Sequence, residues 1–132
     1  MKEPEYMLIV DDDDTIAVGL ADYLKLHGCQ VDIAHDFEAA RTLIERREYV
    51  IAVIDIVGTG DAAETGMTFL EWLRKKSPQT VVVVLTAYRT AWLEHFSLNL
   101  GVAFFLDKPK SFDEIIDVVS TVLTKPVTAE SR

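Results

Sequence analysis

Four aspartates stand in a row at Asp11–Asp14, directly after an apolar run. Adjacent carboxylates repel each other by about 1 kcal/mol per pair even in water, so something must compensate their charge. Asp13 and Asp14 are expected to cap a helix, because carboxylates accept hydrogen bonds from the backbone of a helix N-terminus. Asp11 and Asp12 fall at the end of the preceding strand, where a hard divalent cation such as Mg²⁺ is their natural partner.

Three other apolar runs are also followed by reactive side chains, namely those of Asp55, Thr86 and Lys108. A carboxylate directly after a run as apolar as residues 50–54 is unfavourable for folding, which indicates that Asp55 has a functional role. Together with the first aspartates, these residues form a set suited to phosphoryl transfer. The acids can hold Mg²⁺, one acid can act as the nucleophile, and the hydroxyl and the ammonium can bind oxygens of the incoming group.

Short apolar runs alternate with amphipathic stretches of helical length along the whole chain, which predicts a doubly wound α/β fold with a parallel sheet. The carboxyl ends of parallel strands open on one edge of the sheet, so the reactive residues are expected to converge there. The expected strands are Met7–Val10, Gln30–Ala34, Val50–Ile54, Val81–Leu85 and Ala103–Leu106. The expected helices are Thr15–His27, Phe37–Arg47, Met67–Lys76, Tyr88–Leu100 and Phe112–Leu123.

Length and composition place limits on the function. The 132 residues are expected to form one domain over residues 1–124, followed by a polar tail or linker stub at 125–132. A net charge of −9 argues against direct nucleic-acid binding, and 49% hydrophobic residues argue against disorder. No apolar run is long enough to span a membrane, and the single cysteine, Cys29, fits a reducing compartment. We therefore expect a cytoplasmic protein.

Four blocks of this sequence resemble the signature segments of the receiver domains of two-component response regulators: residues 7–13, Val53–Asp55, Leu85–Ala87 and Phe105–Pro109. The resemblance covers residues 6–124. It implies a flavodoxin-like fold with five helices and a five-stranded sheet in the order 2-1-3-4-5. It also implies that a sensor histidine kinase or a phosphotransfer protein donates a phosphoryl group to Asp55. Such a domain is a signalling switch, which catalyses only its own phosphotransfer and dephosphorylation.

The same resemblance implies a magnesium site. Asp12 and Asp55 would ligate Mg²⁺ directly, together with the backbone carbonyl of Val57, while Asp11 would act mainly through water.

The resemblance further implies how the switch works. Thr86 would bind one phosphoryl oxygen and Lys108 would pair with another. Phe105 matches the aromatic position that swings inward with Thr86 on activation, so the face formed by the fourth strand, fourth helix, fifth strand and fifth helix would control an output domain or partner. A homodimer through the fourth helix, fifth strand and fifth helix is a further expectation.

Residues 58–66 depart from the family pattern. Glycine and threonine occupy the region where a proline usually follows the acceptor, and Gly66 comes 11 positions after Asp55 rather than about eight. Three glycines among small polar residues predict a mobile surface loop, about three residues longer than usual. One hypothesis is that Asp61 or Glu64 in this segment modulates the lifetime of the phosphoryl group.

The fourth expected helix has two apolar stripes. Trp92 and Phe96 lie four residues apart on one face, while Leu93 and Leu100 lie on another. Burial against the sheet accounts for one stripe only, so the aromatic face is predicted to bind a second copy or another partner.

Three alternatives remain. Residues 8–15 also match the opening of haloacid-dehalogenase-type phosphatases, in which Asp11 would be the nucleophile and Asp13 the general acid; this leaves Asp55 idle. A binding module with the receiver fold but without phosphorylation is the second. An FMN-binding flavodoxin is less favoured, because the loop after the first strand is acidic. None of the histidines is expected to be a ligand: His27, His35 and His95.

Overall fold

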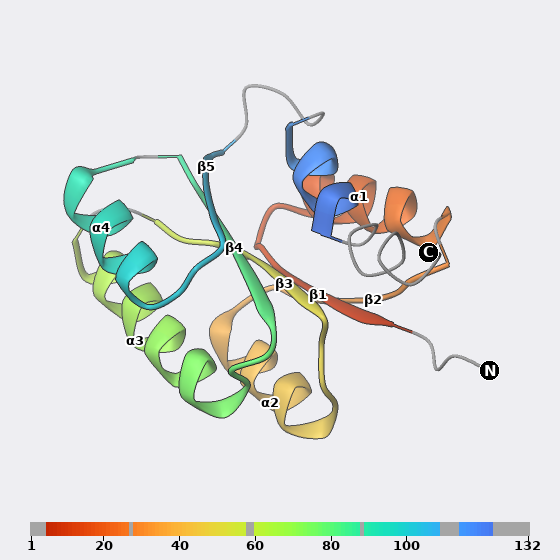
Figure 1. The fold of residues 1–132 in the computed structure, drawn as a ribbon, viewed down its shortest axis with the longest axis horizontal. Helices are drawn as coiled ribbons and strands as arrows, with labels where there is room; N and C mark the ends of the chain where they lie inside the picture. Colours follow the sequence, from red (N-terminus) through yellow and green to blue (C-terminus); the bar gives the residue numbers. More distant parts are fainter. Residues whose placement is uncertain (1–4, 27, 58–59, 88, 109–113, 123–132) are drawn as a thin grey trace, which may run out of the picture.

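The computed structural model describes residues 5–26, 28–57, 60–87, 89–108 and 114–122, without the side chains of residues 60–62. Five parallel strands form one sheet in the order β2-β1-β3-β4-β5. Figure 1 shows this sheet in the middle of the molecule, with helices on both of its faces. The predicted fold class and strand order are confirmed.

Apolar runs form the strands, because central strands of a parallel sheet are covered on both faces. In β1, the four residues of 7–10 are all buried, and in β3 the four residues of 51–54 are buried. The strands are β1 (Tyr6–Val10), β2 (Gln30–Ala34), β3 (Ile51–Asp55), β4 (Val81–Thr86) and β5 (Phe104–Asp107).

The helices form two layers. Side chains of α2, α3 and α4 pack with one face of the sheet around Phe69, and side chains of α1 and residues 114–122 pack with the other face around Leu20. None of the described helices is both long and apolar enough to cross a membrane. The helices are α1 (Asp14–Leu26), α2 (Phe37–Arg46), α3 (Gly60–Lys76), α4 (Ala91–Asn99) and a further helical stretch at 114–122.

Local side-chain chemistry sets where the helices begin and end. Asp13 accepts from the backbone N–H of Thr15 at 3.0 Å, and Asp36 accepts from that of Ala39 at 2.7 Å. These bonds satisfy backbone donors that a helix leaves open at its start. After α1, Gly28 adopts a φ of 84°, which a residue with a side chain rarely tolerates. The predicted cap at Asp13 is therefore confirmed, whereas Asp14 is the first residue of α1.

The segment predicted as a mobile loop is largely helical. Helix α3 begins at Gly60 rather than at Met67, so the residues before Met67 form about two further turns of helix instead of a longer loop. Burial explains the difference, because Ala63 lies in the core and Gly66 packs directly against Ile56. Gly58 and Thr59 lie outside the described residues.

Other boundaries shift less. Helix α4 begins at Ala91 rather than at residue 88, because Thr90 caps it by accepting from the N–H of Leu93 at 3.0 Å. Strands β3 and β5 each begin one residue later than predicted. Residues 109–113 and the predicted tail at 125–132 lie outside the described residues.

Candidate functional site

Side chains at or directly after the ends of β1, β3 and β5 meet at one edge of the sheet. Lys108 donates from its Nζ to Oδ1 of Asp11 at 3.0 Å and to Oδ2 of Asp55 at 2.8 Å. These partners are 97 and 53 residues away in the sequence. Parallel strand order produces the contact, because the carboxyl ends of all the strands open on the same edge.

A carboxylate cluster lies beside the lysine. Asp11, Asp12 and Asp55 each place one oxygen within 4.8 Å of the others. Asp11 is 3% exposed, and its Oδ2 has no hydrogen-bond partner among the described residues. A buried carboxylate oxygen without a partner is costly unless a cation takes up its charge. Oxygen donors of this kind suit a hard divalent cation, so these residues fit Mg²⁺.

The pKa values of both Asp55 and Lys108 are raised in this cluster. Burial raises the pKa of Asp55 above its ordinary value, and the negative charges of Asp11 and Asp12 raise it further, although the hydrogen bond from Lys108 partly offsets them. Burial alone would lower the pKa of Lys108, but its hydrogen bonds to Asp55 and Asp11 outweigh burial, so this pKa is raised. The lysine is therefore held as an ammonium between two acids.

Thr86 and Phe105 lie on the strands beside this cluster. Thr86 ends β4 and is fully buried, and its carbonyl accepts from the backbone N–H of Lys108 at 2.6 Å. Phe105 pairs in register with Val84 and is also buried. Side chains two residues apart on a strand share a face, so Phe105 lies on the same face of the sheet as Thr86.

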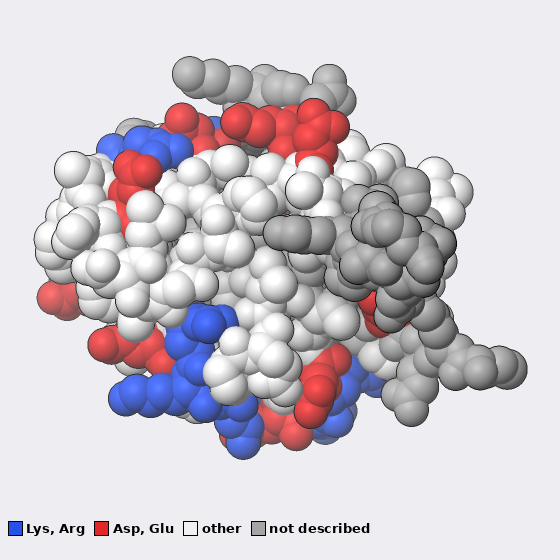
Figure 2. All heavy atoms as spheres, in the orientation of Figure 1, with Lys and Arg blue, Asp and Glu red and all other residues white. Residues whose placement is uncertain are grey.

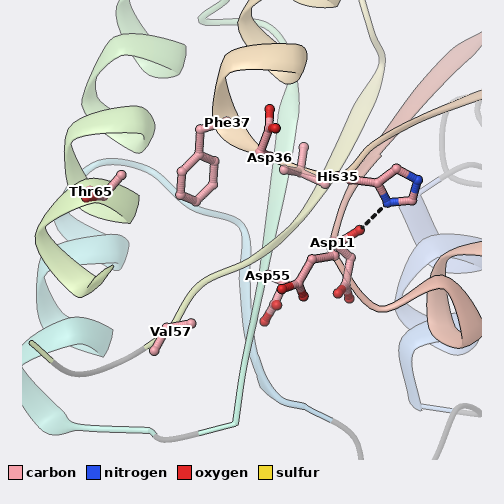
Figure 3. Close-up of a pocket in the computed structure, with 9 residues that line it drawn as sticks. Asp11, His35, Asp36, Phe37, Asp55, Val57 and Thr65 are labelled. Carbon is pink, nitrogen blue, oxygen red and sulfur yellow. Dashed lines mark hydrogen bonds between the residues drawn. The ribbon is translucent and has the colours of Figure 1, made fainter. Parts of the chain in front are cut away.

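A pocket of about 320 Å³ opens next to the carboxylates (Figure 3). The acids at the ends of β1 and β3 line it, together with Phe37 from α2 and Thr65 from α3. The Phe37 ring is held in place by stacking on Phe69, with 4.7 Å between the ring centroids. Val57, the predicted carbonyl ligand, is exposed and also lines the pocket.

Sequence reasoning missed several residues that line this pocket. His35 and Asp36 follow β2, and the ring Nδ1 of His35 lies 3.2 Å from the backbone carbonyl of Asp11 (Figure 3). His35 also lies 3.4 Å from the carboxylate of Asp14. The rule that predicted the other members would have found these residues, because β2 is parallel to β1 and ends at the same edge.

The segment before Gly66 contributes one described residue to the lining of the pocket. Thr65 lines the pocket, whereas Glu64 is exposed on α3 and is not among the lining residues. The side chain of Asp61 lies outside the described part of the chain.

Helix α4 presents the predicted aromatic face. Trp92 is 61% exposed and its ring lies 6.1 Å from that of the half-buried Phe96, whereas Leu93 is fully buried on the inner side. Figure 2 shows a largely uncharged surface over α4, with charged side chains of both signs along the upper and lower edges of the view. The two apolar stripes therefore face different surroundings.

Comparison with known proteins gives a consistent result. Residues 7–120 match the family model of the response regulator receiver domain. The photosynthetic apparatus regulatory protein RegA of Rhodobacter capsulatus is 29% identical over 114 residues, and the transcriptional regulatory protein CpxR of Escherichia coli is 28% identical over 126 residues. These matches cover 86% and 96% of this chain, but only 60% and 52% of those relatives.

The fold has close counterparts among solved structures. A CheY-like response regulator receiver domain protein from Methanospirillum hungatei superposes with a TM-score of 0.82 at 26% identity, covering 96% of this chain and 99% of that chain. A receiver domain of a Francisella response regulator superposes with a TM-score of 0.75 at 29% identity, covering 92% and 98%.

Proposed function

Because this chain belongs to the response regulator receiver family, we propose that it accepts a phosphoryl group on Asp55 from a sensor histidine kinase or phosphotransfer protein. The observation that supports this assignment best is the bridge of Lys108 between Asp11 and Asp55. It places the ammonium and the carboxylate of Asp11 next to Asp55, the acid that ends the central strand β3. Among the described residues, no other lysine contacts two carboxylates in this way.

The proposed chemistry is a displacement at phosphorus. A carboxylate oxygen of Asp55 attacks the phosphoryl group of a phosphohistidine, the new O–P bond forms, and the P–N bond breaks. The leaving imidazole nitrogen keeps the electron pair and takes up a proton. Lys108 stabilises the negative charge of the phosphoryl oxygens, and Thr86 binds another of them after a small movement of β4.

Asp11, Asp12, Asp55 and the backbone carbonyl of Val57 are proposed to hold Mg²⁺. When bound, Mg²⁺ would neutralise part of the charge that the carboxylates and phosphoryl oxygens bring together. The orphaned Oδ2 of Asp11 supports this assignment.

Phosphorylation is proposed to act through Thr86 and Phe105. When Thr86 moves toward the phosphoryl group, it leaves space on the face of the sheet that it shares with Phe105, and the surface of β4, α4 and β5 repacks. A partner or output domain that binds one packing better than the other would sense the phosphate. The chain is in this proposal a switch and not an enzyme acting on other substrates, and we place it in the cytoplasm.

The domain itself is proposed to end near residue 124, with 125–132 as a tail or linker. The family match ends at residue 120, and the chain spans 60% and 52% of two regulatory relatives, which fits a receiver attached to an output domain. The aromatic face of Trp92 and Phe96 is proposed to contribute to a homodimer through α4 and β5. Sedimentation of the chain with and without phosphoryl groups tests this, and a monomer in both states contradicts it.

The phosphatase alternative has less support. Asp13, which would be the general acid, is engaged in capping α1. Asp55, which that reaction would not use, lies at the centre of the cluster. The unphosphorylated binding module is tested directly by the experiment below.

The decisive experiment is incubation with a small acyl phosphate and Mg²⁺, followed by intact mass analysis and peptide mapping. Wild-type chain is expected to gain one phosphoryl group that hydroxylamine removes, and Asp55→Asn is expected to gain none. Asp36→Asn is the matched control, because Asp36 lines the same pocket but is not the proposed acceptor. An adduct that persists in Asp55→Asn, or that maps to Asp11, contradicts the proposal.

Magnesium binding is tested separately by thermal unfolding. Mg²⁺ is expected to raise the unfolding temperature of wild-type chain, since a ligand that binds only the folded state stabilises it. Asp12→Asn is expected to weaken this effect about tenfold or more in apparent Kd, and Asp22→Asn, on the exposed side of α1, is expected to leave it unchanged. An equal response of all three proteins contradicts the assignment.

A further inference from the structure

Arg89, in the segment between β4 and α4, contacts two other elements at once. Its Nε donates to Oδ1 of Asp107 at 2.9 Å, and its Nη2 donates to the backbone carbonyl of Phe105 at 3.1 Å, both in β5. Its Nη1 lies 2.8 Å from Oε1 of Glu94, in the first turn of α4. One guanidinium therefore connects β5, the segment after β4 and the start of α4.

The same guanidinium covers an aromatic ring. Cζ of Arg89 lies 4.9 Å from the centroid of the Phe105 ring, which is 8% exposed. A planar cation over an aromatic face is attracted by the ring and also shields it from water. Phe105 cannot leave its present position toward solvent on this side without displacing Arg89.

The anchors of Arg89 lie next to the phosphorylation site. Asp107 pairs in register with Thr86 and precedes Lys108, whose backbone N–H donates to the carbonyl of Thr86. A movement of Thr86 toward a phosphoryl group would therefore also shift Asp107, because the ends of β4 and β5 are paired there. Contacts that fix Asp107 therefore oppose such a movement.

A surface ion pair alone would explain little, because exposed pairs contribute weakly. The side chain of Arg89 is 35% exposed, and its partners Glu94 and Asp107 are 37% and 45% exposed. Arg89 differs from such a pair in two ways. Its planar guanidinium contacts both β5 and α4, and the same group covers the buried ring of Phe105.

We propose that Arg89 is a positioning residue that latches the segment between β4 and α4 onto β5 and keeps Phe105 covered. The latch holds the resting arrangement of the α4–β5 face and sets how readily Thr86 and Phe105 rearrange. Its regulatory consequence rests on the proposed function of Asp55, whereas its effect on the resting molecule does not.

Amide hydrogen exchange on the full chain tests the latch without any phosphodonor. Arg89→Ala is expected to raise exchange about tenfold in residues 91–94 and 104–107, while the rest of the sheet keeps its protection. Exchange in Arg89→Lys is expected to lie between that of wild type and that of Arg89→Ala, because lysine keeps the charge but lacks the planar guanidinium. The matched control is Arg41→Ala. Arg41 also lies over aromatic rings, those of Phe69 and Trp72, but it belongs to α2, which contacts β1 and β2, toward the edge of the sheet opposite β5.

A second measurement uses beryllofluoride with Mg²⁺ as the phosphoryl analogue. In wild-type chain, the analogue is expected to raise exchange in the same two segments; in Arg89→Ala, this increase is expected to shrink, because the segments are already released. Asp107→Asn provides an independent variant, which removes one anchor and is expected to show part of the same increase without the analogue.

Exchange in Arg89→Ala within twofold of wild type would overturn the latch, as would an increase spread evenly over the whole chain or an equal local increase in Arg41→Ala. Failure of wild-type chain to take up a phosphoryl group would instead overturn the role of Asp55. The resting exchange measurement still decides the latch in that case.

Discussion

Lys108 and Asp55 form a 2.8 Å ion pair in which the side chains are only 13% and 12% exposed. Little water is available to screen this pair, so removing one partner leaves the other charge uncompensated. Asp11, the second partner of the same ammonium, is buried still more deeply.

Lys108→Met is therefore expected to lower the free energy of unfolding by about 2–4 kcal/mol in a chelator. Introduced into Asp55→Asn, the same change is expected to cost at least about 1 kcal/mol less, because one of the orphaned carboxylates is gone. Urea denaturation of the four proteins measures the coupling. Lys75→Met, at an exposed position of α3, serves as the control for loss of a lysine, and equal costs of Lys108→Met in both backgrounds contradict the bridge.

Asp55 is expected to make stability depend on pH. Its pKa in the folded chain is raised above the ordinary value of 3.8, chiefly by burial. The folded state therefore binds this proton more tightly than the unfolded state. The stability that results is fully present below the unfolded-state pKa and is lost as pH rises through the higher folded-state pKa.

The comparison of wild-type chain with Asp55→Asn isolates this effect in a chelator. As pH increases from about 4, the free energy of unfolding of wild-type chain is expected to fall relative to that of the variant. Above the raised pKa of Asp55, the difference between the two proteins is expected to stay constant. Urea denaturation across this range measures the difference. A difference that stays constant, or that grows in favour of wild type, contradicts the raised pKa.

Gly66 is expected to be required by packing rather than by backbone conformation. A β-carbon at this position would lie 2.8 Å from Cγ2 of Ile56, a fully buried side chain. Gly66→Ala is expected to destabilise the chain by about 1–3 kcal/mol through overpacking, in spite of the better helix propensity of alanine. Thermal unfolding measures this cost, and a smaller cost in the Ile56→Ala background identifies the contact as its source.

Ser97 and Thr80 provide a contrast between two buried hydroxyls. Oγ of Ser97 has no hydrogen-bond partner among the described residues, whereas Oγ1 of Thr80 donates to the carbonyl of Tyr49 at 2.7 Å. Ser97→Ala is expected to be neutral or to stabilise by up to about 1 kcal/mol, and Thr80→Val to destabilise by about 1–3 kcal/mol. Chemical denaturation measures both variants, and a Ser97→Ala chain destabilised as much as Thr80→Val contradicts the prediction.

Much of the fold could be predicted because its signals are local. The apolar runs before Asp11 and Asp55 are short and continuous, and Asp13, Asp36 and Gly28 mark helix ends through their own backbone preferences. Parallel strands end on a common edge, so the convergence of Asp11, Asp55 and Lys108 also followed from the sequence pattern.

Contacts between distant segments were decided by the tertiary structure. The helical start of α3 was missed because its glycines and small polar residues favour a loop locally, whereas burial of Ala63 and the fit of Gly66 on Ile56 are gained only when the helix lies on the sheet. Arg89 shows the same limit, since nothing near it in the sequence identifies Asp107 as its partner. Local preferences are properties of the residue itself, but such contacts depend on which segments the fold brings together.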